Sequence, residues 1–307
     1  MTKSIFIPHH FSASDFNAAD LSVNFDPETY SDYVYSGQDT AELFGALQAF
    51  GVKHGIAVPN YDLCDKQKAT AKFAAAGFAT FATVAVNTRA DLENFPHDPI
   101  ILKPSVSFNT SSTGHTLDAA MYCVRTKAEL LAQLDALGAF VGSLTTDEPF
   151  IAQQVADGNE DKYAALILSG VVNGQGEIWH CPSLELNTYF KDKVRKVQSV
   201  WSEENNTEET AALQSCVDAL LSAENTKNCF YQMQFLRAGG MWVPHDFQFR
   251  MTYYVNGYLI RTPYAFYREA LIKYAFDAAN EKPALPRSFG LHFYPDPVDG
   301  RPPVKNF

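Results

Sequence analysis

The chain has 307 residues, of which 46% are hydrophobic and 19% charged, a balance that is typical of a folded globular protein and excludes extended disorder. Its formal net charge is −11 and it has no basic stripe, which argues against nucleic acid as a partner. No apolar run approaches the roughly 20 residues of a transmembrane helix, so no membrane partner is expected.

The cysteines and the N-terminus indicate the cellular compartment. The five cysteines are scattered, odd in number and without CxxC spacing, which predicts buried free thiols rather than a disulfide framework or a zinc site. The N-terminal apolar stretch is too short for the core of a signal peptide. We therefore expect a cytoplasmic protein. The length of the chain gives room for two or three structural units around at least one large core.

The first half of the chain predicts alternating strands and helices. Residues 5–7 form an apolar strand, and a helix follows between residues 43 and 50. Asp65 is a suitable N-cap for a helix that ends at Gly77, and a strand over 81–86 comes next.

Further along, residues 99–104 have the composition of a buried strand, and Thr126 with Glu129 forms a capping box for a following helix. Residues 150–155 and 163–172 predict two more strands, and 173–176 predicts a hairpin turn.

The second half ends in a helix, a hairpin and a tail. Leu213, Val217 and Leu220 share one face of a predicted helix. Two strands, 230–235 and 241–249, follow and are joined by a glycine-rich turn.

Two lysines stand at the ends of predicted elements. Lys66 opens the helix that Asp65 caps, and Lys103 ends the apolar strand. A buried ammonium group needs a counter-charge, so Lys103 is interpreted as an anion ligand. For Lys66, an ordinary solvated position on the first turn is the alternative.

A loop of small polar residues, 105–115, comes directly after Lys103. Small side chains let backbone N–H groups approach anionic oxygens closely, and hydroxyl groups add donors. A Ser/Thr-rich loop with no such role is the alternative. The central residues of the 105–115 loop are Ser111, Ser112, Thr113 and Gly114.

The two strands of the late hairpin carry a polar face. Alternation along a strand points Asp246, Gln248 and Arg250 to one side, with Gln234 on the neighbouring strand. Carboxylate and amide oxygens are the ligands that Mg²⁺ prefers, and an arginine can hold a phosphoryl group. An ordinary half-buried hairpin with a polar face is the alternative.

In this order and spacing, the segments from Asp65 to Arg250 resemble the ATP-grasp enzymes, such as D-alanine–D-alanine ligase, biotin carboxylase and carbamoyl phosphate synthetase. The resemblance implies an α+β or α/β fold in which two α/β lobes hold ATP between them. The implied division is a small N-terminal layer, an N-lobe, a C-lobe and a Pro-rich tail, over residues 1–64, 65–149, 150–280 and 281–307.

The resemblance also assigns roles to residues. Lys103 and Arg250 would be catalytic, and Gln234, Asp246 and Gln248 would bind Mg²⁺, for which Mn²⁺ can substitute. Asp246 and Gln248 stand where relatives have glutamate and asparagine, so one ligand is a methylene shorter and the other a methylene longer. The nucleotide-binding set would be Lys66, Lys103, Ser111, Ser112, Thr113, Gly114, Gln153, Gln154, Val155 and Glu160.

Within the segment 150–160, backbone groups near Val155 would pair with the adenine edge and Gln153 would lie near the adenine amine. Glu160 would accept from the ribose hydroxyl groups, and Asp161 is the alternative. A surface turn after an edge strand is the plainer interpretation of the same residues.

The function implied is an ATP-dependent ligase that activates a carboxylate as an acyl phosphate and joins it to an amine or a thiol. An ATP-grasp kinase and a non-catalytic nucleotide-binding regulatory protein are the alternatives. The partners would be ATP and small-molecule or peptide substrates, and a homodimer is compatible with the sequence. Lys191, Lys193 and Arg195 predict a solvated charged face, with contact to an anionic substrate as the alternative.

Overall fold

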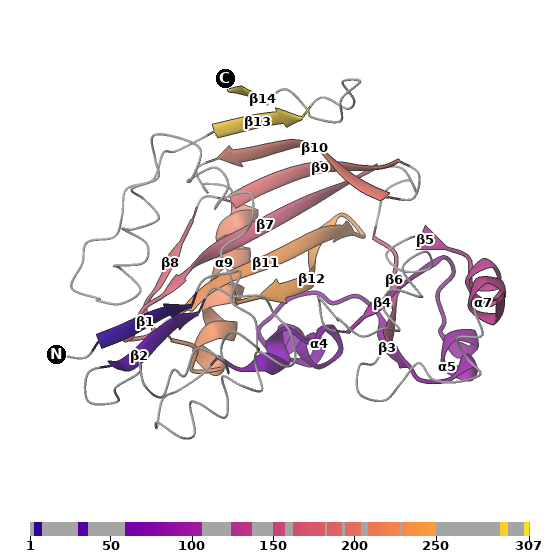
Figure 1. Ribbon diagram of the computed structural model, residues 1–307, viewed down its shortest axis with the longest axis horizontal. Coiled ribbons are helices and arrows are strands. Elements are labelled where there is room, and N and C mark those ends of the chain that lie inside the picture. The colour runs from indigo at the N-terminus through magenta and orange to yellow at the C-terminus, as the bar shows by residue number, and fades with distance from the viewer. Residues whose placement is uncertain are drawn as a thin grey trace.

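The computed structural model contains two sheets and the helices that pack against them (Figure 1). The residues that the structure describes are 3–7, 30–35, 59–105, 124–136, 150–156, 162–181, 183–191, 194–203, 208–227, 229–249, 289–293 and 304–306.

The large sheet has ten strands in the order β1-β2-β11-β7-β9-β10-β13-β14, with β12 also paired to β11 and β8 to β7. β1 pairs in parallel with β2, and β2 in parallel with β11, whereas the other pairs are antiparallel. The strand bounds are β1 Lys3–Ile7, β2 Tyr30–Tyr35, β7 Lys162–Val172, β8 Ile178–His180, β9 Ser183–Lys191, β10 Val194–Glu203, β11 Cys229–Ala238, β12 Met241–Gln248, β13 Phe289–Phe293 and β14 Val304–Asn306.

The strands of the predicted N-terminal layer and of the Pro-rich tail therefore lie at opposite ends of this one sheet (Figure 1). Local patterns did not predict β2, β13 or β14, and β9 and β10 were likewise unassigned. Each of these strands is positioned by pairing with a strand that is distant in sequence or has a weak hydrophobic pattern.

The small sheet has four antiparallel strands in the order β3-β6-β4-β5. Two helices, α5 and α7, pack against it, and together they bury a core that includes Leu92, Leu102 and Leu134 (Figure 1). The strand that opens the predicted C-lobe, β6, lies in this sheet between β3 and β4. The bounds are β3 Thr83–Val86, α5 Arg89–Asn94, β4 Ile100–Pro104, β5 Val124–Arg125, α7 Lys127–Ala136 and β6 Phe150–Gln154.

Local capping determines where the helices begin. The capping box of α7 is confirmed, because Thr126 N donates to Glu129 Oε2 at 3.0 Å and Glu129 N donates to Thr126 Oγ1 at 3.2 Å. A second box at Thr88 and Asp91 starts α5, a helix that the sequence analysis missed. Hydrogen bonds from the backbone and hydroxyl of Thr88 lower the pKa of Asp91.

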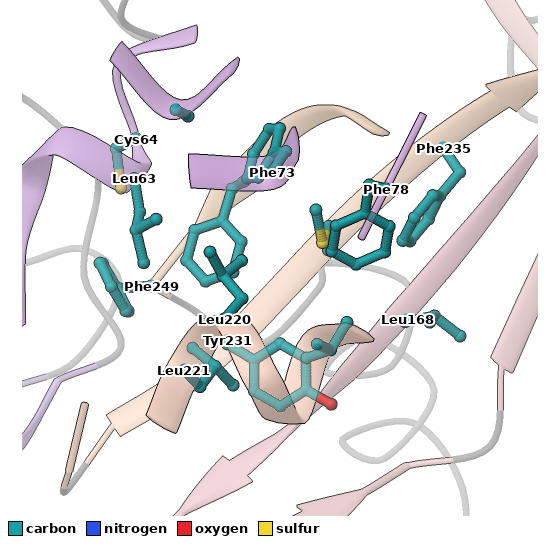
Figure 2. Packing of buried hydrophobic residues seen from close by; sticks show 14 of the residues in the cluster. Leu63, Cys64, Phe73, Phe78, Leu168, Leu220, Leu221, Tyr231, Phe235 and Phe249 are labelled. Carbon is teal, nitrogen blue, oxygen red and sulfur yellow. The ribbon is translucent and has the colours of Figure 1, made fainter. Parts of the chain in front are cut away.

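The main core joins the large sheet to α4 (Lys66–Ala75), α9 (Glu208–Ala223) and the short helix η1 (Tyr61–Leu63). Figure 2 shows Phe73 of α4 and Leu220 and Leu221 of α9 gathered over Tyr231 and Phe235 of β11. The predicted apolar face of α9 is confirmed. Tyr231 and Phe235 lie on the same face of β11, because side chains alternate along a strand.

Tyr231 is fully buried, and burial raises the pKa of its hydroxyl well above the usual value. The hydroxyl is hydrogen-bonded to His180 Nδ1, whose other ring nitrogen, Nε2, lies 2.9 Å from Asp218 Oδ1. Gly170 is required beside it, since a Cβ there would lie 2.2 Å from the Trp179 carbonyl oxygen. The cluster links β8 and β11 to α9, the helix to which Asp218 belongs, and it leaves the tyrosine hydroxyl paired.

No helix in the described ranges combines the length and the apolar character needed to cross a membrane.

The core of the small sheet gives a test of this packing. Leu134 of α7 is 0% exposed, whereas Leu131 on the same helix is only partly buried. We expect Leu134→Ala to lower the free energy of unfolding by about 2–5 kcal/mol, because it leaves a cavity, and Leu131→Ala to lower it by less. Urea denaturation of both variants measures the difference, and equal losses would contradict the placement of α7.

Candidate functional site

Lys66 lies at the point where α4 meets the end of β4. Asp65 caps the helix in extended conformation, and its carboxylate accepts from the backbone N–H groups of Gln67 and Lys68, as the sequence predicted. The N–H of Lys66 donates to the carbonyl oxygen of Ser105 at 2.8 Å. These bonds hold the first turn of α4 against the last residues of β4.

The ammonium group of Lys66 forms a buried ion pair with Asp246 of β12. Nζ lies 3.3 Å from Asp246 Oδ1, and the two side chains are only 6% and 10% exposed. Nζ is also 3.5 Å from the Ser105 carbonyl oxygen. Lys66 is therefore not a solvated lysine, and the ion pair links α4 and β4 to the large sheet.

Lys103 comes from the face of the small sheet that is turned away from its helices. It stands opposite Ile151 in the β4–β6 register, and Gln153 lies two residues further on the same face. The alternate residues, Leu102 and Ala152, belong to the core under α5 and α7. Lys103 is 5% exposed, so its ammonium group is buried as the sequence predicted.

Lys103 reaches β12 as well. Its Nζ lies 3.5 Å from the carbonyl oxygen of His245, an extra residue inserted where the β11–β12 register shifts between Gln234 and Phe235. Such a bulge bends the strand and redirects its groups. The irregularity thus brings a backbone oxygen of the large sheet to the lysine of the small sheet, next to Asp246.

The predicted polar face of the hairpin is confirmed. Gln234 stands opposite Asp246, and Gln232 opposite Gln248, so all four side chains project from one face of β11 and β12. Gln248 Nε2 donates to Asp246 Oδ2 at 3.0 Å, and Gln232 Nε2 donates to Gln248 Oε1 at 2.9 Å. The result is a directed chain of hydrogen bonds that ends on the carboxylate.

The chemistry of this cluster suits a phosphate-bearing ligand with a divalent cation. Lys66 and Lys103 supply two buried ammonium groups for anionic oxygens. Asp246, Gln234 and Gln248 supply hard oxygens, the donors that Mg²⁺ prefers. The described residues contain no group of three or more His, Cys, Asp or Glu side chains that could hold a metal, so a cation here needs amide and ligand oxygens.

Two buried oxygens in the cluster support the same conclusion. Gln232 Oε1 and Ser105 Oγ have no hydrogen-bond partner within the described part of the chain. Buried polar atoms are normally paired, so unpaired ones indicate a ligand, an ion or a water. Gln232, Ser105 and the His245 carbonyl were not predicted as site groups. Extending the period-2 pattern by one step from Gln234 would have found Gln232.

The predicted hinge lies at the end of β6. Gln153 is 4% exposed and its Nε2 donates to Thr83 Oγ1 at 3.3 Å. Gln154 holds the strand end to Ala82, through its own N–H at 2.9 Å and its side-chain oxygen at 3.4 Å. Val155 follows and is half-buried. Their role in adenine recognition stays a prediction.

The remaining predicted residues lie outside the described part of the chain. These are Ser111, Ser112, Thr113, Gly114, Glu160 with its alternative Asp161, Lys193 and Arg250. Lys191 is the last residue of β9, and Arg195 is the second residue of β10.

The sequence matches no protein-family model and no curated protein. The structure resembles many solved structures. An L-amino acid ligase from Bacillus licheniformis is 16% identical, with a TM-score of 0.56 over 92% of this chain and 68% of that chain. The N5-carboxyaminoimidazole synthetase from Staphylococcus aureus, complexed with ADP, is 10% identical, with a TM-score of 0.55 over 95% of this chain and 83% of that chain.

A phosphoribosylamine–glycine ligase from Thermotoga maritima is 12% identical, with a TM-score of 0.57 over 98% of this chain and 82% of that chain. At these identities the likeness shows the fold alone. The shared fold is the one that the motifs predicted.

The buried ion pair predicts that substituting two neighbouring lysines lowers the free energy of unfolding by different amounts. Lys66→Met leaves a buried carboxylate without its counter-charge and should lower the free energy of unfolding by about 3–5 kcal/mol. Lys68 pairs with Asp62 at 3.0 Å, but both side chains are largely exposed, so Lys68→Met should cost at most about 1 kcal/mol. Guanidinium denaturation compares them, and similar midpoints would show that the Lys66 ion pair is not buried.

Proposed function

We propose that this chain, which adopts the ATP-grasp fold, is an ATP-dependent ligase that activates a carboxylate and joins it to an amine or a thiol. The observation that carries the proposal is the convergence of two buried ammonium groups on one strand. Lys66 and Lys103 come from separate elements and both meet β12, at Asp246 and at the adjoining His245 carbonyl. Two buried cations beside one carboxylate suit the phosphates of a nucleotide better than they suit a closed core.

The solved structures with this fold support the same class of reaction. They include proteins named L-amino acid ligase and phosphoribosylamine–glycine ligase, and one synthetase of the same fold is complexed with ADP. The active groups of this chain would then lie where Lys66 and Lys103 meet β12.

In the proposed reaction, ATP with its Mg²⁺ supplies the phosphoryl group that activates the carboxylate. Lys66 and Lys103 would hold phosphate oxygens and neutralise their charge. Asp246, Gln234 and Gln248 would hold the cation, and Arg250 would hold the transferred phosphoryl group. Catalysis would come from positioning and charge stabilisation, without a covalent nucleophile on the protein.

The groups of the protein that would bind the cation carry little net negative charge. Asp246 is the one carboxylate in the set, and in this structure Lys66 already neutralises it. A divalent cation would therefore bind weakly to the protein alone, and its affinity would depend on the nucleotide phosphates.

The nucleotide site is tested by comparing two lysines. Lys103→Ala should weaken ATP binding about 10- to 100-fold, because a charged hydrogen bond is worth roughly 1.5–3 kcal/mol. Lys68→Ala, on the exposed surface of α4, should leave the affinity unchanged. Isothermal titration calorimetry measures both, and equal affinities would remove Lys103 from the phosphate site.

The reaction class is tested by the substrate dependence of ADP release. A screen of carboxylates with and without amines should find release that requires both, with an amide product visible by mass spectrometry. Release with one stable phosphorylated product would instead indicate a kinase, and nucleotide binding without turnover would indicate a regulatory protein.

Asp246→Asn connects that activity to the described cluster. The variant should lower turnover about 10²- to 10³-fold, the usual loss when one group that stabilises transition-state charge is removed. Nucleotide binding at the β6 hinge should be largely kept, as calorimetry with ADP can show. Full activity in this variant would place the cation ligands elsewhere.

A further inference from the structure

Two side-chain hydrogen bonds beside Asp246 run in the same direction, toward its carboxylate. Asp246 Oδ1 lies 3.3 Å from the Lys66 ammonium group, and Oδ2 accepts from Gln248 Nε2 at 3.0 Å. Gln248 Oε1 in turn accepts from Gln232 Nε2 at 2.9 Å. The chain ends at Gln232 Oε1, which is buried and has no hydrogen-bond partner among the described residues, although Gln232 is only 3% exposed.

The carboxylate dictates this direction. An ionised carboxylate can only accept hydrogen bonds, so Gln248 must turn its NH₂ group toward Asp246. Its carbonyl oxygen then faces Gln232, which must present its own NH₂ group. With both amides in this direction, the carbonyl oxygen of Gln232 has no hydrogen-bond partner among the described residues.

A divalent cation next to Asp246 would require the opposite direction. Mg²⁺ and Mn²⁺ accept oxygen ligands, so Gln248 could bind the cation only after turning its carbonyl oxygen toward it. The NH₂ group of Gln248 would then face Gln232. If Gln232 turned as well, its Oε1 would accept that hydrogen bond and would no longer be unpaired.

We infer that Gln232 is a positioning residue that acts through Gln248. The two amides form a reversible pair, which points NH₂ groups toward Asp246 in the metal-free protein and points the Gln248 carbonyl oxygen toward a divalent cation when one binds. This inference rests on the proposed function, because it uses the cation that accompanies ATP. It adds Gln232, which would not touch the cation, to the groups that determine metal affinity.

An amide is suited to this position because it can both donate and accept. Methionine, of similar length, can do neither, and glutamate can only accept. If the hydrogen bond from Gln232 to Gln248 served the fold alone, a side chain without the buried, unpaired oxygen Oε1 would be sufficient. The side chain at 232 thus has an acceptor oxygen that no hydrogen bond among the described residues uses.

A double-mutant cycle tests the inference by metal binding rather than by turnover. Free Mn²⁺ is measured by electron paramagnetic resonance during titration of the protein–ADP complex, for the wild type, Gln232→Met, Gln248→Ala and the double variant. Gln232→Met should weaken Mn²⁺ binding about tenfold, as expected for a residue that orients a metal ligand. In the Gln248→Ala background the same change should weaken it by less than about twofold, because the partner is gone.

Two outcomes would overturn the inference while leaving the proposed function intact. One is an equal loss in both backgrounds, which would mean that Gln232 acts independently of Gln248. The other is an unchanged Mn²⁺ affinity in Gln232→Met. If instead the wild-type complex binds no more Mn²⁺ than free ADP does, the metal part of the proposed function fails and this inference fails with it.

Gln232→Glu provides a second variant in case the methionine variant does not fold. Glutamate can only accept, so it favours the orientation of Gln248 that presents its oxygen to the cation. We expect Mn²⁺ affinity equal to or above that of the wild type. A tenfold loss in this variant would contradict the reversible pair.

Discussion

The ion pair between Lys66 and Asp246 is the constraint around which the described site is arranged. A charge with little access to water needs a counter-charge close by. Here α4 provides Lys66 and the large sheet provides Asp246, from distant parts of the chain. The pair can form only if α4 begins where it does and β12 turns its polar face toward it. Asp65, as the cap of α4, and Ser105, which accepts from the Lys66 N–H, meet the first requirement.

The second requirement is met by the pairing of β11 with β12. One face of β11 packs against α4 and α9 with Tyr231 and Phe235 (Figure 2). The other face carries Gln232 and Gln234. The apolar face supplies the burial energy that holds the sheet together. The polar face includes the Gln232 carbonyl oxygen, which has no hydrogen-bond partner among the described residues.

The proposed function depends on a cation site built mainly from amides. An amide has no charge but two polar ends, so its direction follows whatever lies beside it. In a site with several carboxylates, the metal-free protein would have to hold several negative charges together. Here Lys66 alone balances the charge of the one carboxylate, Asp246, and the same lysine is suited to bind a phosphate oxygen. Nucleotide and cation would then depend on each other for affinity, which is a form of coupling that needs no movement of the sheets.

The sequence by itself determined several of the local elements and the identity of the fold. Asp65 as the N-cap, the end of α4 before Gly77, the glycine turn between β11 and β12, and the shared face of Asp246 and Gln248 all follow from patterns within a few residues. The burial of Lys103 follows from its place in an apolar strand. The ordered motifs were sufficient to recognise the ATP-grasp fold, which the structural likenesses then showed.

Tertiary structure alone decided which of these elements meet. The position of β6 in the small sheet, the parallel pairing of β2 with β11, the bulge at His245 and the partner of Lys66 are contacts between residues far apart in the chain. Periodicity shows which side of a strand is polar, but not which charge lies across from it. The direction of the amides of Gln232 and Gln248 depends on the charge of Asp246 and its neighbours, and only the folded arrangement supplies that.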